Sequence, residues 1–212
     1  MNQQLRPTIA PNLAIPPVEY DQQYFNMLTN ILRLYFTQND ADWRALVDTI
    51  GGANLKFPYG DFSSNLTQTL TAANTPTRIL LDTAEFNNYI TFATTGTVTI
   101  PQSGIYNAAF SIELSNTDTV IHTADVWLRQ NGVDVPRSGS EWAVVNSHGG
   151  TPGYTVAAAN FFIEAKAGDT VELWWTADST LVSLLYQAAQ TTPFSMPAIP
   201  SVVLTLNYVS AI

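Results

Sequence analysis

The sequence contains no cysteine, so disulfide frameworks, thiolate metal sites and cysteine nucleophiles are excluded together. Charged residues are also few, at 12% of the 212 residues, which is about half the usual share for a soluble domain. Only two of them are lysines, and the net charge is −9 at pH 7. Because nucleic acids and anionic membrane surfaces attract basic proteins, we expect neither as a partner.

No apolar run is long enough to cross a bilayer. Residues 1–17 hold one basic residue and four prolines but no continuous apolar stretch, so we expect that this segment is not a secretory signal.

Catalytic and metal-binding patterns are also missing. The two histidines lack zinc-site spacing and any nucleophile motif; His122 is expected near the end of a strand and His148 in a loop. Asp118, Asp125 and Asp178 do not follow the spacing of a calcium loop, although calcium binding by these carboxylates is kept as an alternative. We therefore predict no enzyme, no catalytic residue, no cofactor and no metal, with polysaccharide cleavage by a carboxylate pair as a remote alternative.

The chain begins with a proline-rich arm over residues 1–17. Prolines remove backbone donors and disfavour helix at the preceding residue, and the arm has too few apolar groups to fold alone. We expect it to become ordered by attachment to another protein. The candidate attachment residues are Arg6, Pro7, Ile9, Leu13 and Ile15.

Residues 18–52 are predicted to be helical, with one helix over 18–38 and a shorter one after it. Asp40 would cap the second helix and Gly51-Gly52 would end it. Apolar residues in the first helix follow a heptad spacing, which favours contact with other chains, although an ordinary amphipathic helix has the same pattern. These candidate trimer contacts are Tyr24, Leu28, Ile31 and Tyr35.

Residues 53–76 resemble a linker, and residues 77–212 have the pattern of many short strands. Apolar and polar residues alternate from Tyr106 to Leu114, and Asn131-Gly132 favours a tight hairpin turn. The sequence thus predicts a mainly β protein: an antiparallel jelly-roll sandwich preceded by an extended arm and one or two short α-helices.

Two aromatic residues, Trp127 and Trp174, fall on the polar faces of their predicted strands. Exposed tryptophans serve either subunit interfaces or carbohydrate binding. The low charge of this region favours a subunit interface. Binding of a host glycan is the alternative.

Three patterns of the strand region occur in the order seen in the tumour necrosis factor and complement globular-head family. They are Gly104-Ile105-Tyr106 at a strand start, Asn131-Gly132 after a strand, and Ala167-Gly168-Asp169-Thr170-Val171-Glu172-Leu173. The region 77–212 resembles this family, which implies a jelly roll and a trimer. The family's calcium ligands cannot be matched to residues here.

The N-terminal segment, with Pro16-Pro17 and Asn30-Ile-Leu-Arg-Leu-Tyr-Phe36, resembles the start of structural proteins from marine and cyanobacterial tailed phages. This resemblance implies attachment to a virion, assembly in the host cytoplasm and release by lysis. We therefore expect a homotrimeric capsid decoration or cement protein that binds the major capsid protein or another virion protein. The alternative is a tail-fibre or adhesin tip that binds a host receptor or glycan.

Overall fold

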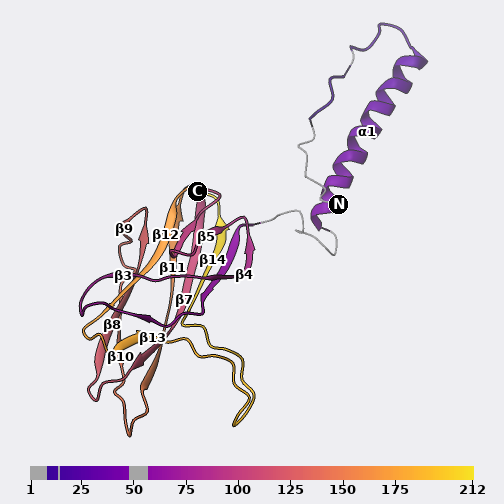
Figure 1. The fold of residues 1–212 in the computed structure, drawn as a ribbon. Coiled ribbons are helices and arrows are strands. Elements are labelled where there is room, and N and C mark those ends of the chain that lie inside the picture. Colours follow the sequence, from indigo (N-terminus) through magenta and orange to yellow (C-terminus); the bar gives the residue numbers. More distant parts are fainter. Residues whose placement is uncertain (1–8, 14, 48–56) are drawn as a thin grey trace. The chain divides into compact units, whose positions relative to one another are not determined.

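The computed structural model describes residues 9–13, 15–47 and 57–212 (Figure 1). The chain divides into a helical unit up to residue 56 and a β unit from Phe57 to Ile212. Each unit is described by itself below.

The helical unit contains one continuous helix, α1 (Gln22–Val47), within the one or two helices predicted, and it runs through the point at which the sequence suggested a second helix would begin. It begins after Asp21, whose carboxylate Oδ1 accepts a hydrogen bond from the Gln23 amide at 2.8 Å. This contact satisfies one of the amides that a helix start leaves without a partner, so the helix starts at Gln22 and not at residue 18.

Asp40 lies inside α1 and does not cap a second helix. Its carboxylate pairs with the Arg44 guanidinium one turn later, at 3.0 Å. No proline or glycine interrupts Gln22–Val47, so nothing in the backbone forces a break. The predicted end at Gly51-Gly52 lies outside the described residues.

The β unit contains fourteen described strands. They are β1 (Tyr59–Ser64), β2 (Gln68–Thr69), β3 (Thr77–Arg78), β4 (Thr83–Asn88), β5 (Thr91–Ala93), β6 (Thr97–Thr99), β7 (Gly104–Asn116), β8 (His122–Gln130), β9 (Val133–Asp134), β10 (Ser140–Val144), β11 (Gly153–Ala165), β12 (Thr170–Ala177), β13 (Val182–Leu184) and β14 (Val202–Ser210).

These strands form two antiparallel sheets. Sheet A has the order β11-β7-β14-β1-β4, and β13 with β2 extends the β14 side of β7. Sheet B has the order β10-β8-β12-β6-β5, with β3 beside β12 and β9 beside β8. The chain crosses from one sheet to the other at eight places: between β2 and β3, β3 and β4, β4 and β5, β6 and β7, β7 and β8, β10 and β11, β11 and β12, and β12 and β13. This connectivity is that of a jelly roll, and it confirms the predicted fold class.

The core lies between the two sheets and takes alternate residues from each. Tyr106 and Ile112 of β7 and Leu204 of β14 are buried from sheet A, while Leu173 and Trp175 of β12 are buried from sheet B. Because side chains alternate along a strand, the residues between them lie on the outer faces of the sandwich.

The β unit starts earlier than the sequence indicated. The segment 53–76, for which the sequence predicts a linker, includes β1 and β2; β1 pairs with both β4 and β14, and its Phe62 is fully buried. The apolar–polar pattern hid β1 because Ser63 and Ser64 are buried as well. The ordered sandwich therefore begins close to Phe57 and not at residue 77.

Candidate functional site: the outer faces of the sandwich

The outer face of sheet A, which we call face A, is the first candidate surface. It consists of the residues that alternate with core residues along three neighbouring strands. Only two of them, Glu113 and Glu164, carry a charge. The set is Ile105, Asn107, Ala109, Ser111 and Glu113 of β7, Val156, Ala158, Asn160, Phe162 and Glu164 of β11, and Val203, Thr205 and Asn207 of β14.

The centre of face A is made of small uncharged side chains. Ala109 lies opposite Asn160 on one side and Thr205 on the other. Asn107 Nδ2 donates to Asn160 Oδ1 at 2.9 Å, and nearby Phe162 is 68% exposed. Such a low-charge surface with exposed aromatic groups is typical of a protein interface.

Two carboxyl groups on this side of sheet A, Glu113 and Asp61, have pKa values raised above the usual range. Burial raises the pKa of Glu113. Burial also raises the pKa of Asp61 on β1, and the charge of nearby Glu85 adds to the effect. Asp61 pairs across the sheet with Phe86, which is exposed. Partial burial within a single chain thus already penalises charge on this surface.

The outer face of sheet B, which we call face B, carries a hydrogen-bonded ionic cluster. Glu172 Oε1 accepts from the Arg78 guanidinium at 2.8 Å and from the Thr97 hydroxyl at 2.9 Å. Glu172 Oε2 accepts from Trp174 Nε1 at 2.9 Å. Burial alone would raise the pKa of Glu172, but the combined effect of these hydrogen bonds is larger. The pKa of this carboxyl is therefore lowered.

The cluster continues across face B through Arg129. Its guanidinium carbon lies 3.9 Å above the centre of the Trp174 ring, and its Nε contacts Asp134 Oδ1 at 2.6 Å. The same Asp134 oxygen accepts from Trp127 Nε1 at 2.8 Å. Hydrogen bonds from Arg129 and Trp127 lower the pKa of Asp134. The charged groups of this cluster are therefore paired within one chain. Elsewhere on face B the buried Thr176 hydroxyl has no hydrogen-bond partner among the described residues, and burial together with the charges of Glu141 and Asp178 raises the pKa of Asp125.

The structure brings the two predicted interface tryptophans together on face B. Both indole N–H groups of Trp127 and Trp174 already donate to carboxylates, and Arg129 covers the Trp174 ring. A sugar stacks on an open aromatic face, and Arg129 occupies one face of the Trp174 ring. The alternation placed both tryptophans on the outer side of their strands, where each is half-buried. Their acceptors are near in sequence: Glu172 lies two residues from Trp174, and Asp134 lies seven residues from Trp127.

A second cluster, which sequence reasoning missed, surrounds His122 at the start of β8. Its Nε2 lies 3.0 Å from Asp118 Oδ2 and its Nδ1 lies 2.9 Å from Asp178 Oδ1. The hydrogen bond to Asp118 raises the pKa of His122; burial opposes this, and Asp178 adds to the rise. The hydrogen bond from His122 likewise lowers the pKa of Asp118.

The geometry gives His122 an ion-pairing role. Both ring nitrogens face carboxylates, so neither is available to activate a hydroxyl. Asp125 is not among its contacts, and burial raises the pKa of Asp125. Within the described ranges, no set of three or more histidine, aspartate or glutamate side chains forms a metal site. The other histidine, His148, is exposed in a turn, as expected.

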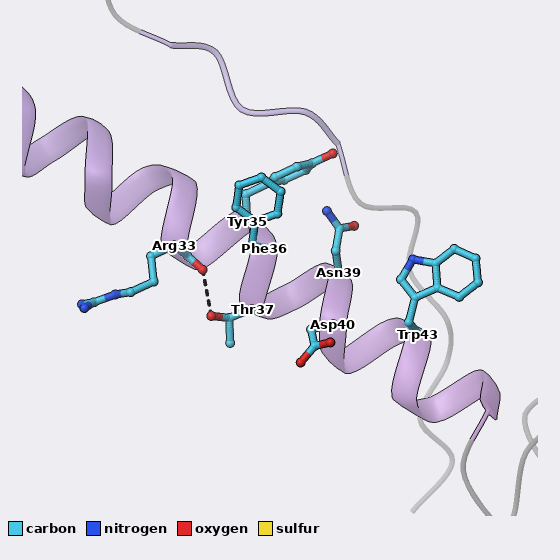
Figure 2. Close-up of a pocket in the computed structure, with 7 residues that line it drawn as sticks. All are labelled: Arg33, Tyr35, Phe36, Thr37, Asn39, Asp40 and Trp43. Atoms are coloured by element: carbon cyan, nitrogen blue, oxygen red, sulfur yellow. Dashed lines mark hydrogen bonds between the residues drawn. The ribbon is translucent and has the colours of Figure 1, made fainter.

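The helix α1 presents large apolar side chains on its surface. The predicted contact residues Tyr24, Leu28, Ile31 and Tyr35 are half-buried, whereas Leu34 and Phe36 are exposed. Figure 2 shows a hollow along α1, with Tyr35, Phe36, Asn39 and Trp43 on one side and Arg33, Thr37 and Asp40 on the other. All of its described lining residues belong to one helix, so the hollow is an open strip of surface.

Two of the five arm candidates, Arg6 and Pro7, lie outside the described residues. The other three, Ile9, Leu13 and Ile15, are all exposed. Their exposure leaves apolar groups free to contact another protein.

No model of a known protein family matches this sequence, and no curated protein matches it significantly. Among the described helical residues, none form a stretch that is both long and apolar enough to cross a membrane.

Proposed function

We propose that this chain is a homotrimeric structural protein of a bacteriophage particle, and specifically a capsid decoration or cement protein. The contrast between the two sheet faces carries the proposal. The ionic cluster of face B pairs its charges within the chain, whereas face A carries small and apolar groups with few charges. A stable assembly buries low-charge surface, so face A is the surface that we expect between subunits.

The position of β14 supports a three-fold arrangement. In the family that the strand region resembles, the final strand runs in the inner sheet beside the three-fold axis. Here β14 lies inside sheet A, between β7 and β1, and contributes Val203 and Thr205 to face A. On this proposal the trimer contacts come from face A and from the heptad residues of α1, and the tryptophans of face B point away from the axis.

The N-terminal arm supplies the attachment in this proposal. It resembles the start of tailed-phage structural proteins, and its apolar residues Ile9, Leu13 and Ile15 are exposed. The partner would be the major capsid protein or another virion protein, and the site of action would be the virion.

Sedimentation equilibrium of the purified protein tests the assembly. We expect a trimer at micromolar concentration, and Leu28→Asp is expected to weaken it while the β-sheet circular dichroism is retained. A monomer at that concentration would contradict the proposal.

Particle binding tests the role. A protein without residues 1–17 is expected to remain folded and trimeric but to lose its incorporation into particles. Normal incorporation of this truncated protein would place attachment elsewhere in the chain.

A tail-fibre or adhesin tip is the second candidate, and the length of α1 favours it. Its 26 residues at about 1.5 Å each give roughly 39 Å of continuous helix, which suits a short stalk. Gold labelling of particles separates the two: label over the whole head supports decoration, and label at the tail supports the fibre.

A further inference from the structure

A long hairpin, residues 185–200, leaves sheet A between β13 and β14. Its two legs are paired by backbone hydrogen bonds of 2.8–3.0 Å between Gln187 and Ile199 and between Gln190 and Met196. Figure 1 shows it as the yellow-orange hairpin that projects away from the labelled strands. We call this segment the 185–200 hairpin.

Both ends of the hairpin are anchored at the same residue of β7. The Leu185 amide donates to the Glu113 carbonyl at 2.8 Å, and the Glu113 amide donates to the Ser201 carbonyl at 2.9 Å. In the plane of the sheet the neighbouring places are taken, because β2 pairs with β13 and β1 pairs with β14. The inner side is filled by the core. The hairpin therefore leaves sheet A on its outer side, which is face A.

The chemistry of the hairpin matches that of face A. Residues 179–212 contain no charged side chain at all. Phe194 at the hairpin tip is 59% exposed. An isolated two-stranded ribbon is only marginally stable in water, so a projecting ribbon with an exposed aromatic tip gains stability from a surface that covers it.

The prolines of the hairpin limit how it can bind. Pro193, Pro197 and Pro200 have no amide hydrogen to donate to an added strand. Strand pairing of another chain with the tip or with the returning leg, residues 196–200, is therefore disfavoured. Contact through side chains is favoured instead. The absence of basic residues removes any attraction to nucleic acid or anionic lipid.

We propose that the 185–200 hairpin is an inter-subunit arm that packs against face A of a second copy of this chain. Each leg of about eight residues, at about 3.3 Å per residue, reaches roughly 25 Å, which is more than the ~10 Å between packed sheets. A hairpin rooted on face A can thus extend over a neighbouring sandwich. Three such contacts, each made head to tail, close a trimer. This inference rests on the proposed self-assembly and identifies the segment that crosses between subunits.

Photocrosslinking from the hairpin tip tests the inference. Because the chain has no cysteine, Ser195→Cys creates a single thiol at the tip, which a benzophenone maleimide can label. After irradiation of the labelled trimer we expect covalent dimers and trimers on a denaturing gel, with the crosslinked peptide from β7, β11 or β14. The matched control is Ala143→Cys carrying the same label, because Ala143 is exposed on face B. Irradiation of this labelled variant is expected to crosslink no chains.

A second variant measures the contribution of the tip. Phe194→Ser is expected to raise the dissociation constant of the trimer at least about tenfold, because aromatic anchors dominate interface energies. Val133→Ser removes a similarly exposed apolar side chain from β9 and is expected to leave the constant unchanged.

The possible failures are distinguishable. If the unmodified protein sediments as a monomer, the proposed self-assembly is wrong. If it is a trimer but the Ser195→Cys label crosslinks no second chain and Phe194→Ser has no effect on dissociation, the hairpin inference is wrong and the trimer stands.

Discussion

Face A and face B belong to the same sandwich, yet Glu172 of face B and Glu113 of face A have pKa values shifted in opposite directions. On face B a carboxylate, Glu172, accepts hydrogen bonds from Arg78 and Thr97 of neighbouring strands and from Trp174 of its own strand, and these bonds lower its pKa. On face A the carboxyl of Glu113 is half-buried, and burial raises its pKa. The ionic cluster of face B thus has the internally paired charges of a solvent-exposed surface. Face A has the low charge and exposed apolar groups that are typical of a protein interface.

This difference also explains why aromatic content is a poor guide to an interface. Face B holds two tryptophans, but Asp134 and Glu172 accept their indole protons and Arg129 covers one ring. Face A has fewer aromatics, and Phe162 there is exposed. The informative quantity is how fully the polar groups around an aromatic ring are paired within the chain.

The largest expected effect comes from placing a charge on face A. Ala109→Arg points a guanidinium into the centre of this face, and in the trimer that cation would be buried without a partner, at a cost of several kcal/mol. We expect sedimentation velocity to show monomers with unchanged far-ultraviolet circular dichroism. Ala143→Arg on face B is the matched control and is expected to remain trimeric; identical behaviour of the two variants would remove the distinction between the faces.

Loss of the central carboxylate of face B is expected to act on folding and not on assembly. Glu172→Ala leaves Arg78, Thr97 and Trp174 without their acceptor, at a site where Glu172 is 9% exposed. We expect the free energy of unfolding in urea to fall by about 2–3 kcal/mol, with the trimer retained. Glu141→Ala, on the exposed edge of the same face, is expected to change it by less than about 0.5 kcal/mol.

The stacked guanidinium of face B is expected to contribute less. Arg129→Met keeps the aliphatic stem but removes the charge above Trp174 and the contact to Asp134. We expect a loss of about 1 kcal/mol in urea unfolding and a change in tryptophan fluorescence. Arg129→Lys keeps the charge without the planar stack, so its stability is expected to lie between those of the methionine variant and the original protein.

The smallest effect is expected at His122, at the loop end of sheet B. Its pKa is raised above the usual 6.5, so its charged form stabilises the fold. This contribution is complete below about pH 6.5 and is lost as the pH rises through the higher pKa of the folded state. We expect the melting temperature to decline over that interval at constant ionic strength. His122→Gln should flatten this dependence, and an unchanged slope in that variant would assign the decline to other groups.

Most of the long strands were predictable from the sequence. The alternation from Tyr106 to Leu114 in β7 correctly separated core residues from outer residues, for example Tyr106 and Ile112 from Asn107. Asn131 and Gly132 both have positive φ, as the predicted tight turn requires. These features are local, because side-chain alternation and turn chemistry act over a few residues.

Strands β1, β4 and β10 were not predicted, because they are short, polar or placed at the edges of the sheets. The sequence also gives no sign of the 185–200 hairpin, which begins where β13 ends at Leu184 and the chain leaves the sheet. No residue pattern marks that exit, which depends on Glu113 in a different strand.

The sequence by itself determined the mainly β fold, the helical segment before it and the scarcity of charge, because composition and periodicity decide which segments can bury a face. Only the tertiary structure decided which charges are paired. Arg78 and Glu172 are 94 residues apart, and Asp178 reaches His122 from another loop. Such contacts depend on which strands lie side by side, and a jelly roll places strands together that are distant in the chain. The contrast between face A and face B arises from that pairing.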